Sequence, residues 1–353
     1  MDMVVDFYQE LFTSSNPNNF DTILEQISQV VTEERNLELM GEFTALEVEM
    51  PLKQMAPLKS PGPDDMPPIF YQNYWSLVGN DVNDAILMYL NTGTFPPSLD
   101  HSFITLIPKV KSPEYISQYR PISLSNVLYR VYSKVLANRL KKLLPNIVSE
   151  QQSAFMTDCL ISDNIMVAFE TLHYMRNHST GSTGFMALKL DMSKAYDWVE
   201  WLYMEKLMKK MGFCEAWVKL MMGCISTATY SILINKEPQG NIVPTRGLHQ
   251  GDPLSPYLFL LGTECFHGLL KKAKDRGEIK GVSISRNGPK LTDLLFADDS
   301  LIFYRAQEND YQKLLEILNT YERASWQQIN RDKTTLFFSK SISSAMQESI
   351  KQA

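Results

Sequence analysis

The segment LTDLLFADDSLIFY (Leu291–Tyr304) contains two apolar runs separated by Ala-Asp-Asp-Ser. Two short apolar runs on either side of turn-forming residues are typical of a β-hairpin. Such a hairpin would carry Asp298 and Asp299 at its tip, next to an otherwise apolar sheet. An isolated Asp-Asp pair is also ordinary turn chemistry, so these two residues do not by themselves indicate a functional site.

A third carboxylate stands at the end of another apolar strand. The segment FMALKLDMSKAYDWVEW (Phe185–Trp201) begins with alternating apolar residues and turns helical by Trp201, and Asp191 comes 107 residues before Asp298. Crowded carboxylates repel each other and raise each other's pKa unless a cation neutralises them. Mg²⁺ prefers carboxylates, waters and substrate phosphates, and two such ions can activate a hydroxyl and stabilise a leaving pyrophosphate. We therefore predict that Asp191, Asp298 and Asp299 converge at one metal site.

The rest of the chain mixes strands with helices. FITLIPK (Phe103–Lys109) reads as a strand, and a long helix is expected from Asn126 to Leu144. GDPLSPYLFLLGTECFHGLLKKA has Pro253 near a helix start and continues as an apolar helix. KSPGPDDMPP (Lys59–Pro68) is rich in proline and predicts a stiff loop. The fold class is therefore predicted to be α+β.

Charge is distributed unevenly along the chain. There are 34 Lys+Arg and 40 Asp+Glu, which gives a net charge of −6 and excludes a histone-like protein that holds nucleic acid by bulk charge. The first fifty residues contain eleven acids and one base, with helical spacing of the apolar residues, and are expected to form an appended helical segment. From Lys109 to Lys142 there are eight bases against Glu114 alone, so a phosphate-binding face is expected there.

Five of these bases lie on the long helix predicted from Asn126, and three of the five share one face. Val131 and Val135 should face the core, while Arg130, Lys134 and Lys141 should share the outer face. This basic face could follow the backbone of a nucleic acid, or it could be an ordinary solvated helix face.

Cysteine usage and apolar run lengths restrict the location of the protein. The four cysteines, Cys159, Cys214, Cys224 and Cys265, contain no CxxC pair and do not suggest a disulfide framework. The start of the chain lacks the order of a signal peptide, and no apolar run is long enough for a membrane span. The sequence predicts a soluble intracellular protein of the nucleus or cytoplasm that is not secreted.

Eight motifs occur in one order between about Lys59 and Lys340. They are SPGPD, FITLIPK, QYRPISLSNVLYRVYSKVLANRL, QSAF, LDMSKAYD, RGLHQGDPLSPYLF, LLFADDSLIF and the IN-x-x-K of Ile329–Lys333. In this order and spacing the chain resembles the reverse transcriptase domain of a plant-type non-LTR (long interspersed element) retrotransposon. The resemblance implies a right-hand polymerase fold. It assigns an acidic helical segment to 1–58, fingers to 59–180, a palm to 181–340 and the start of a thumb or linker to 341–353, with the thumb largely missing.

The same resemblance implies an activity and its partners. The expected reaction is RNA-directed addition of deoxynucleotides to a primer 3′-OH by two-metal phosphoryl transfer, as part of a retrotransposon protein. Two Mg²⁺ ions would be the cofactors, with Mn²⁺ as a possible substitute. The expected partners are an RNA template, a DNA or RNA primer and deoxynucleoside triphosphates, with no membrane partner and with the oligomeric state left open.

Residue roles follow from the motifs. Asp191 and Asp298 resemble the two metal-binding aspartates of the palm, and Asp299 the third acidic member of the site. Tyr196 stands where the family has an aromatic residue that packs against the deoxyribose and excludes a 2′-hydroxyl. Lys333 resembles the lysine that protonates departing pyrophosphate. The alternatives are a core tyrosine at position 196 and an ordinary loop lysine at position 333.

Four further residues resemble the nucleotide-binding positions of the family. Gln250 and Gly251 match the segment beneath the incoming nucleotide, where glycine permits close approach of the backbone. Lys109 and Arg120 match residues that hold the triphosphate, Lys as a point charge and Arg as a bidentate fork. The competing interpretations are a plain turn before a helix and a solvated basic strand edge.

The sequence also departs from the family pattern. Asp65 and Trp326 stand where the family has glycine, Trp198 replaces an arginine, and Asp293 replaces a histidine. A large residue in a glycine position is costly if its φ is positive. A decayed, non-catalytic RNA-binding remnant is therefore an alternative to a polymerase. A group II intron maturase-like protein is a weaker alternative, because the maturase domain is absent.

Overall fold

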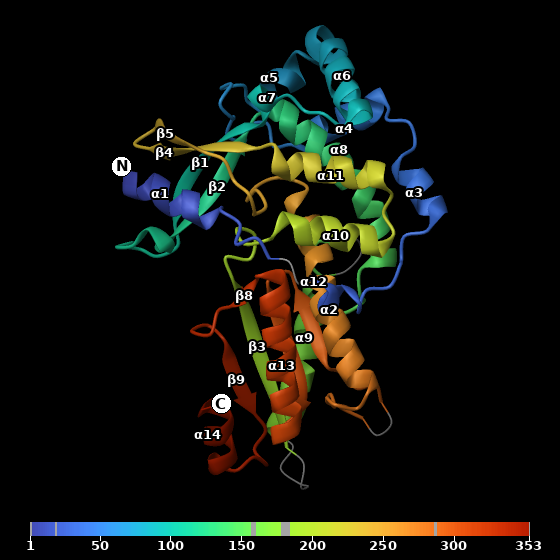
Figure 1. Cartoon of the computed structure of the whole chain (residues 1–353), viewed down its shortest axis with the longest axis vertical. Coiled ribbons are helices and arrows are strands. Elements are labelled where there is room, and N and C mark those ends of the chain that lie inside the picture. Colours follow the sequence, from blue (N-terminus) through green and yellow to red (C-terminus); the bar gives the residue numbers. More distant parts are fainter. Residues whose placement is uncertain (1, 18–19, 157–159, 178–183, 286–287, 353) are drawn as a thin grey trace. The chain divides into compact units, whose positions relative to one another are not determined.

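A computed structural model describes residues 2–17, 20–156, 160–177, 184–285 and 288–352 (Figure 1). The chain divides into two compact units. Unit 1 comprises Met1–Asn16, Gln29–Leu143 and Tyr196–Leu258, and unit 2 comprises Pro17–Ser28, Leu144–Ala195 and Phe259–Ala353. Each unit is therefore assembled from separate stretches of sequence.

Unit 1 contains a four-stranded sheet in the order β2-β1-β4-β5. β1 pairs antiparallel with β2 and parallel with β4, and β4 and β5 are antiparallel. The strands are β1 (His101–Pro108), β2 (Tyr119–Ser125), β4 (Thr229–Ile234) and β5 (Glu237–Ile242). The helices of unit 1 are α1 (Asp2–Leu11), α3 (Glu33–Leu39), α4 (Ala45–Gln54), α5 (Pro68–Asn73), α6 (Trp75–Thr92), α7 (Pro97–Asp100), the short η1 (Ile116–Gln118), most of α8 (Val127–Ile147), α10 (Trp201–Met211) and α11 (Glu215–Ser226).

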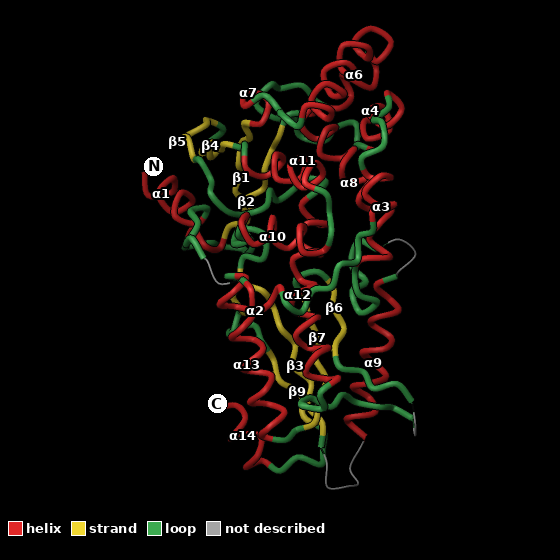
Figure 2. Tube along the Cα trace, turned by 45° about the vertical axis from the view of Figure 1, so that its right-hand side comes forward, coloured by secondary structure: helices red, strands yellow, loops and turns green. Residues whose placement is uncertain are grey.

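Unit 2 contains the second sheet, with order β6-β7-β3-β8 and with β9 also paired to β3. Its strands are β3 (Phe185–Ser193), β6 (Asp293–Phe296), β7 (Asp299–Arg305), β8 (Gln328–Ile329) and β9 (Thr335–Phe338). Its helices are α2 (Asp21–Leu24), α9 (Ile161–Asn177), most of α12 (Ser255–Asp275), α13 (Glu308–Ser325) and α14 (Ser344–Gln352). Helix α9 lies along the sheet (Figure 2), where Met175 packs with Ala187 and Phe303 in a buried cluster.

Local sequence patterns predicted several of these elements correctly. The hairpin expected in Leu291–Tyr304 is confirmed: Phe296 pairs with Asp299, which leaves Ala297 and Asp298 as the turn. The strand that begins at Phe185 and the helix that begins at Trp201 are both present. The helix predicted to begin at Asn126 is α8, and Val131, Val135 and Leu136 on its inner face are buried. The mixture of helices and sheets confirms the α+β class.

The described residues of the first 58 include four helices, α1 to α4, and two of these helices pack against distant parts of the chain. Tyr8 and Leu11 of α1 belong to a buried cluster with Ile104 and Ile232 of the sheet in unit 1. Helix α2 contacts α13 in unit 2. The apolar stripes of these helices were visible in the sequence, but the surfaces that they cover lie far away along the chain.

Membrane and cysteine predictions can be compared with the described residues. No helix in this part of the chain is long and apolar enough to cross a membrane. Cys214, Cys224 and Cys265 are free thiols. Cys159 lies outside the described residues.

Two residues that replace family glycines have left-handed backbone conformations. Trp326, the C-cap of α13, has φ = 60°, and Asp65 has φ = 56°. Because this region favours glycine, Trp326→Gly should raise the free energy of unfolding by about 1 kcal/mol. Gln312→Gly, at an exposed position inside α13, should instead lower it by about 0.5–1 kcal/mol. Urea unfolding of both variants measures the two changes, and a loss of stability in Trp326→Gly would contradict the prediction.

Candidate active site

Two of the predicted metal-binding residues face each other in the sheet of unit 2. Asp191 in β3 is the direct antiparallel partner of Asp299 in β7. Directly paired residues share one face of a sheet, with Cβ atoms about 5 Å apart. Asp298 precedes Asp299 in the hairpin turn, where Ala297 has a positive φ of 53°. The sheet thus carries two adjacent carboxylates, those of Asp191 and Asp299, and Asp298 lies in the hairpin turn next to Asp299.

Lysine ammonium groups accompany both paired carboxylates. Lys333 Nζ lies 3.4 Å from Asp191 Oδ2, and Lys189 Nζ lies 3.2 Å from Asp299 Oδ1. The backbone N–H of Asn330 donates to the carbonyl oxygen of Asp191 at 2.8 Å, which fixes the IN-x-x-K turn beside β3. The structure therefore brings Lys333 to Asp191, a contact that the motifs did not specify. Each of the two paired carboxylates therefore has an ammonium group as its counter-charge.

The donor set has the chemistry that Mg²⁺ requires. Asp191, Asp298 and Asp299 supply hard carboxylate oxygens, the ligand type that this ion prefers. Among the residues that the structure describes, no group of three or more His, Cys, Asp or Glu side chains is gathered closely enough to hold a metal ion. Convergence of the three aspartates at a metal therefore stays a prediction.

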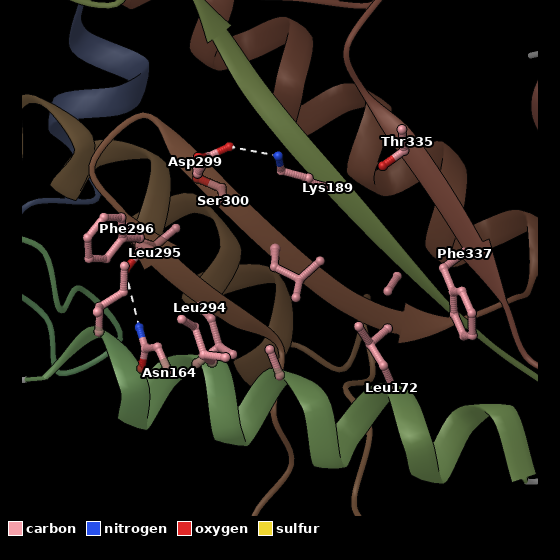
Figure 3. A pocket seen from close by; sticks show the side chains of 15 residues that line it. Asn164, Leu172, Lys189, Leu294, Leu295, Phe296, Asp299, Ser300, Thr335 and Phe337 are labelled. Carbon is pink, nitrogen blue, oxygen red and sulfur yellow. Dashed lines mark hydrogen bonds and ion pairs between the residues drawn. The ribbon is translucent and has the colours of Figure 1, made fainter.

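An apolar cavity adjoins the Asp299–Lys189 pair. Its volume is about 410 Å³, and it lies between α9 and the face of the sheet that carries Asp299. Figure 3 shows the ion pair at one end, Leu294 and Leu172 along the wall, and Phe337 at the far end. The side chains of unit 2 therefore do not fill the sheet face next to the carboxylates.

The predicted triphosphate-binding residues lie together at one end of the β1–β2 hairpin in unit 1. Arg120 pairs with Ile107, two residues before Lys109, and both basic residues are exposed. The Lys109 ammonium donates to the carbonyl oxygen of Ser117 at 3.1 Å. Lys109 follows the last residue of β1, and its backbone N–H donates to the carbonyl oxygen of Gln118 at 2.8 Å, so the two bases are held on neighbouring parts of the hairpin.

The Gln250-Gly251 loop is attached to the same hairpin. The backbone N–H of Ser123 in β2 donates to the carbonyl oxygen of Gln250 at 2.8 Å. Gly251 has φ = 107°, and a Cβ atom there would lie 3.3 Å from the Ser123 carbonyl oxygen, so this turn favours glycine. The N–H of Leu248 donates to the carbonyl oxygen of Tyr196 at 2.8 Å. Unit 1 thus brings Arg120, Tyr196 and Gln250-Gly251 to neighbouring backbone segments.

The basic face predicted on α8 needs a correction. Arg130 does not lie on the outer face: it is 2% exposed, and its Nη2 donates to the carbonyl oxygen of Ser60 at 2.7 Å. The proline-rich loop covers it, held by the Asp64 N–H, which donates to the side chain of Asn126 at 3.1 Å. Helical spacing could not show that the proline-rich loop covers this part of α8, so the prediction was wrong for Arg130. Lys134 and Lys141 are partly exposed.

Buried polar residues lie beneath the Gln250-Gly251 loop, and the sequence did not single them out. The Tyr129 hydroxyl donates to the Cys224 carbonyl oxygen at 2.7 Å and lies 3.3 Å from Nδ1 of His249. Burial lowers the pKa of His249 to about 4, so this imidazole is neutral at physiological pH. Asp252 accepts from the backbone N–H of Leu254 at 2.6 Å. The polar run HQGD between two apolar segments was the signal available in the sequence.

Asp100, another buried carboxyl group of unit 1, should make stability depend on pH. Burial, together with the charge of Asp252, raises its pKa to about 7, although Thr227 donates a hydrogen bond to it. The folded protein then keeps a proton that the unfolded chain releases above about pH 4. Stability should therefore fall as pH rises from about 4 to 7, by at most about 1.4 kcal/mol per pH unit, and then level off.

Asp100→Asn should flatten this dependence, because the amide carries no titratable proton. Urea unfolding at pH 5 and pH 7.5 measures the slope for both proteins. Equal losses of stability in the wild-type chain and the variant would contradict the assignment to Asp100.

Comparisons with known proteins place the chain among proteins of transposable elements. The chain is 28% identical over 333 residues to an uncharacterized 149 kDa protein of transposon TX1 from Xenopus laevis, covering 93% of this chain and 24% of that protein. It is 25% identical over 267 residues to the Pol polyprotein of the retrotransposable element R2DM from Drosophila melanogaster, covering 74% of this chain and 23% of that protein. The chain therefore spans about a quarter of the length of these relatives.

A short segment has higher identity to a plant protein. Over 68 residues the chain is 53% identical to an uncharacterized mitochondrial protein of Arabidopsis thaliana, covering 19% of this chain and 56% of that protein. The family described as reverse transcriptase (RNA-dependent DNA polymerase) matches residues 107–351. This match includes the paired aspartates, the hairpin turn between them and the lysine beside Asp191. The chain belongs to the reverse transcriptase family.

Proposed function

We propose that this chain is an RNA-directed DNA polymerase that adds deoxynucleotides to a primer 3′-OH, as part of a protein from a plant-type non-LTR retrotransposon. The observation that carries the proposal is the direct pairing of Asp191 with Asp299, with Lys333 Nζ 3.4 Å from Asp191 Oδ2. A general binding module would not need acidic residues paired across strands beside an exposed ammonium donor. The Arabidopsis segment supports the plant-type assignment.

Asp191, Asp298 and Asp299 would hold two Mg²⁺ ions, or Mn²⁺ in their place. When bound, these ions supply activation of the attacking hydroxyl and stabilisation of negative charge on the phosphates. The primer 3′-OH oxygen would form a bond to the α-phosphorus of the nucleotide and lose its proton to solvent, while the bond from that phosphorus to the pyrophosphate oxygen breaks. Lys333 is 68% exposed at its side chain and can leave Asp191 to donate a proton to the departing pyrophosphate.

Unit 1 supplies the proposed nucleotide-binding residues. Lys109 and Arg120 bind the triphosphate through charge-assisted hydrogen bonds. Gln250-Gly251 lies beneath the nucleotide, and the Tyr196 ring excludes a 2′-hydroxyl. In a right-hand fold the fingers (59–180) and palm (181–340) would divide these roles.

Template and primer are the remaining proposed partners. Lys134 and Lys141 are available on α8 to contact a phosphate backbone, whereas Arg130 positions the proline-rich loop. RNA-templated synthesis would take place inside the cell, in the nucleus or cytoplasm, where RNA and deoxynucleoside triphosphates are present.

The deciding experiment is primer extension with the purified chain. Poly(rA) primed with oligo(dT), dTTP and Mg²⁺ should give short extension products. A chain that binds the template-primer but incorporates no dTTP would identify the non-catalytic RNA-binding remnant instead.

Sugar selection gives an independent prediction. Tyr196→Val should raise the use of ribonucleotides relative to deoxynucleotides, on the order of 10- to 100-fold, because the ring no longer occupies the space of a 2′-hydroxyl. Tyr196→Phe retains the ring and should keep the wild-type preference. Incorporation of UTP and dTTP on the same template-primer measures the ratio. An equal loss of both substrates in Tyr196→Val would show that Tyr196 is a packing residue.

A further inference from the structure

We infer that Asp197 is a positioning residue, whose carboxylate fixes the orientation of the Gln250 side-chain amide and thereby sets the affinity for the incoming nucleotide. The inference rests on the proposed function. It assigns a role to a residue that follows the sugar-selecting Tyr196 directly in the chain.

The contact is a single hydrogen bond with a defined direction. Nε2 of Gln250 donates to Oδ1 of Asp197 at 2.9 Å. Asp197 is 4% exposed, and Gln250 is partly exposed. A carboxylate accepts hydrogen bonds and cannot donate, so the NH₂ group of Gln250 must face it. The side-chain oxygen of Gln250, Oε1, is then directed away from Asp197. The carboxylate therefore selects one of the two orientations of the side-chain amide.

The backbone holds both ends of this hydrogen bond. On the Gln250 side, the backbone N–H of Ser123 donates to the backbone carbonyl oxygen of Gln250. On the Asp197 side, the N–H groups of Gly247 and Leu248 donate to the carbonyl oxygens of Val199 and Tyr196, both at 2.8 Å. These bonds hold the backbone on both sides, but the side-chain amide of Gln250 can still rotate. The hydrogen bond to Asp197 restricts that rotation.

Close packing explains why the two segments stay in register. Gly247 has φ = 98°, and a Cβ atom there would lie 2.9 Å from the Asp197 carbonyl oxygen. The indole N–H of Trp201 donates to the Gly247 carbonyl oxygen at 2.7 Å. The loop before Gln250 is therefore bound directly to the chain around Asp197.

The negative charge of Asp197 matters for this role. An asparagine has the same shape and costs less to bury. The asparagine amide can donate as well as accept hydrogen bonds, however. It would therefore allow Gln250 to turn its side-chain oxygen, Oε1, toward position 197. Only the carboxylate restricts the amide to one orientation.

Steady-state kinetics of D197N test the inference. On poly(rA)/oligo(dT) the KM for dTTP should rise about three- to tenfold, the factor that one hydrogen bond is worth, while kcat stays within about twofold. Asp100→Asn removes another buried carboxyl group of unit 1 and should leave the KM unchanged. A KM for D197N equal to that of wild type, in a chain that extends primers, overturns this inference alone. A wild-type chain that extends no primer overturns the proposed function and this inference with it.

A double variant separates positioning from general packing. In the Gln250→Ala background, D197N should give no further increase in KM, because its effect passes through the amide. Additive increases in KM would show that Asp197 acts by another route and overturn the inference.

If D197N does not fold, Gln250→Glu tests the same contact from the other side. Two facing carboxylates repel each other when both are ionised, so the KM of this variant should rise between pH 5.5 and pH 8 relative to wild type. A KM ratio that is independent of pH would contradict the contact.

Discussion

Replacing Asp191 by asparagine should reduce primer extension by on the order of 10³-fold or more, the largest effect expected for a single substitution in this chain. Asp191 is the direct partner of Asp299, and its Oδ2 lies 3.4 Å from the Lys333 ammonium group. The variant keeps the shape of the side chain but removes the negative charge that a metal ion requires. Extension of labelled oligo(dT) on poly(rA) measures the rate, and template-primer binding should stay at the wild-type level.

Asp332→Asn is the matched control, because it makes the same change at an exposed carboxylate in the turn that carries Lys333. Its rate should stay within about twofold of wild type, as expected for a surface substitution that touches no reacting group. If both variants lose activity equally, the loss reflects disruption of the turn and not removal of a metal ligand. Residual activity near the wild-type level in Asp191→Asn would refute the metal-site assignment.

The elements of the site could be predicted from local sequence, whereas its contacts could not. Alternation of apolar residues identified β3, and turn residues between two apolar runs identified the hairpin that ends at Asp299. Neither pattern specifies the register that pairs Asp191 with Asp299, because the two residues are 108 positions apart in the chain and each pattern describes only one short segment. Lys333 came within reach of Asp191 through the Asn330 backbone hydrogen bond, which no spacing rule specifies.

Departures from the family pattern could be interpreted only with the structure. Asp293 replaces a family histidine and was counted as a sign of decay. In the structure it is 1% exposed, and its Oδ2 lies 2.8 Å from Nδ1 of His267 on α12. Burial of a carboxylate is tolerated when a paired, hydrogen-bonded group faces it. This departure is therefore accommodated, whereas Trp326 keeps a left-handed conformation that favours glycine, although its N–H donates to the Glu322 carbonyl oxygen at 2.9 Å.

Arg139 shows the same limit of sequence reasoning for stability. It was one of eight bases in a segment expected to face phosphates, yet its side chain is 8% exposed. Its Nε and Nη2 donate to the two carboxylate oxygens of Glu47 at 2.7 and 2.8 Å, and its guanidinium lies 3.7 Å from the centre of the Phe43 ring. Its Nη1 also donates to the carbonyl oxygens of Leu39 and Gly41 at 2.7 and 2.6 Å, at the end of α3. One side chain therefore joins α3, α4 and α8.

Arg139→Ala should lower the free energy of unfolding by about 3–5 kcal/mol, because it leaves Glu47 and the carbonyl groups at the end of α3 without their donor. Arg139→Lys should restore only part of this, since an ammonium group cannot reproduce the bidentate fork. Lys142→Ala removes an exposed base three residues later on α8 and should change stability by no more than about 0.5 kcal/mol. Urea unfolding compares the three variants. Equal losses of unfolding free energy in Arg139→Ala and Lys142→Ala would contradict this prediction. They would mean that water replaces the guanidinium group without cost, and that the packing of apolar side chains alone holds α3 and α4 against α8.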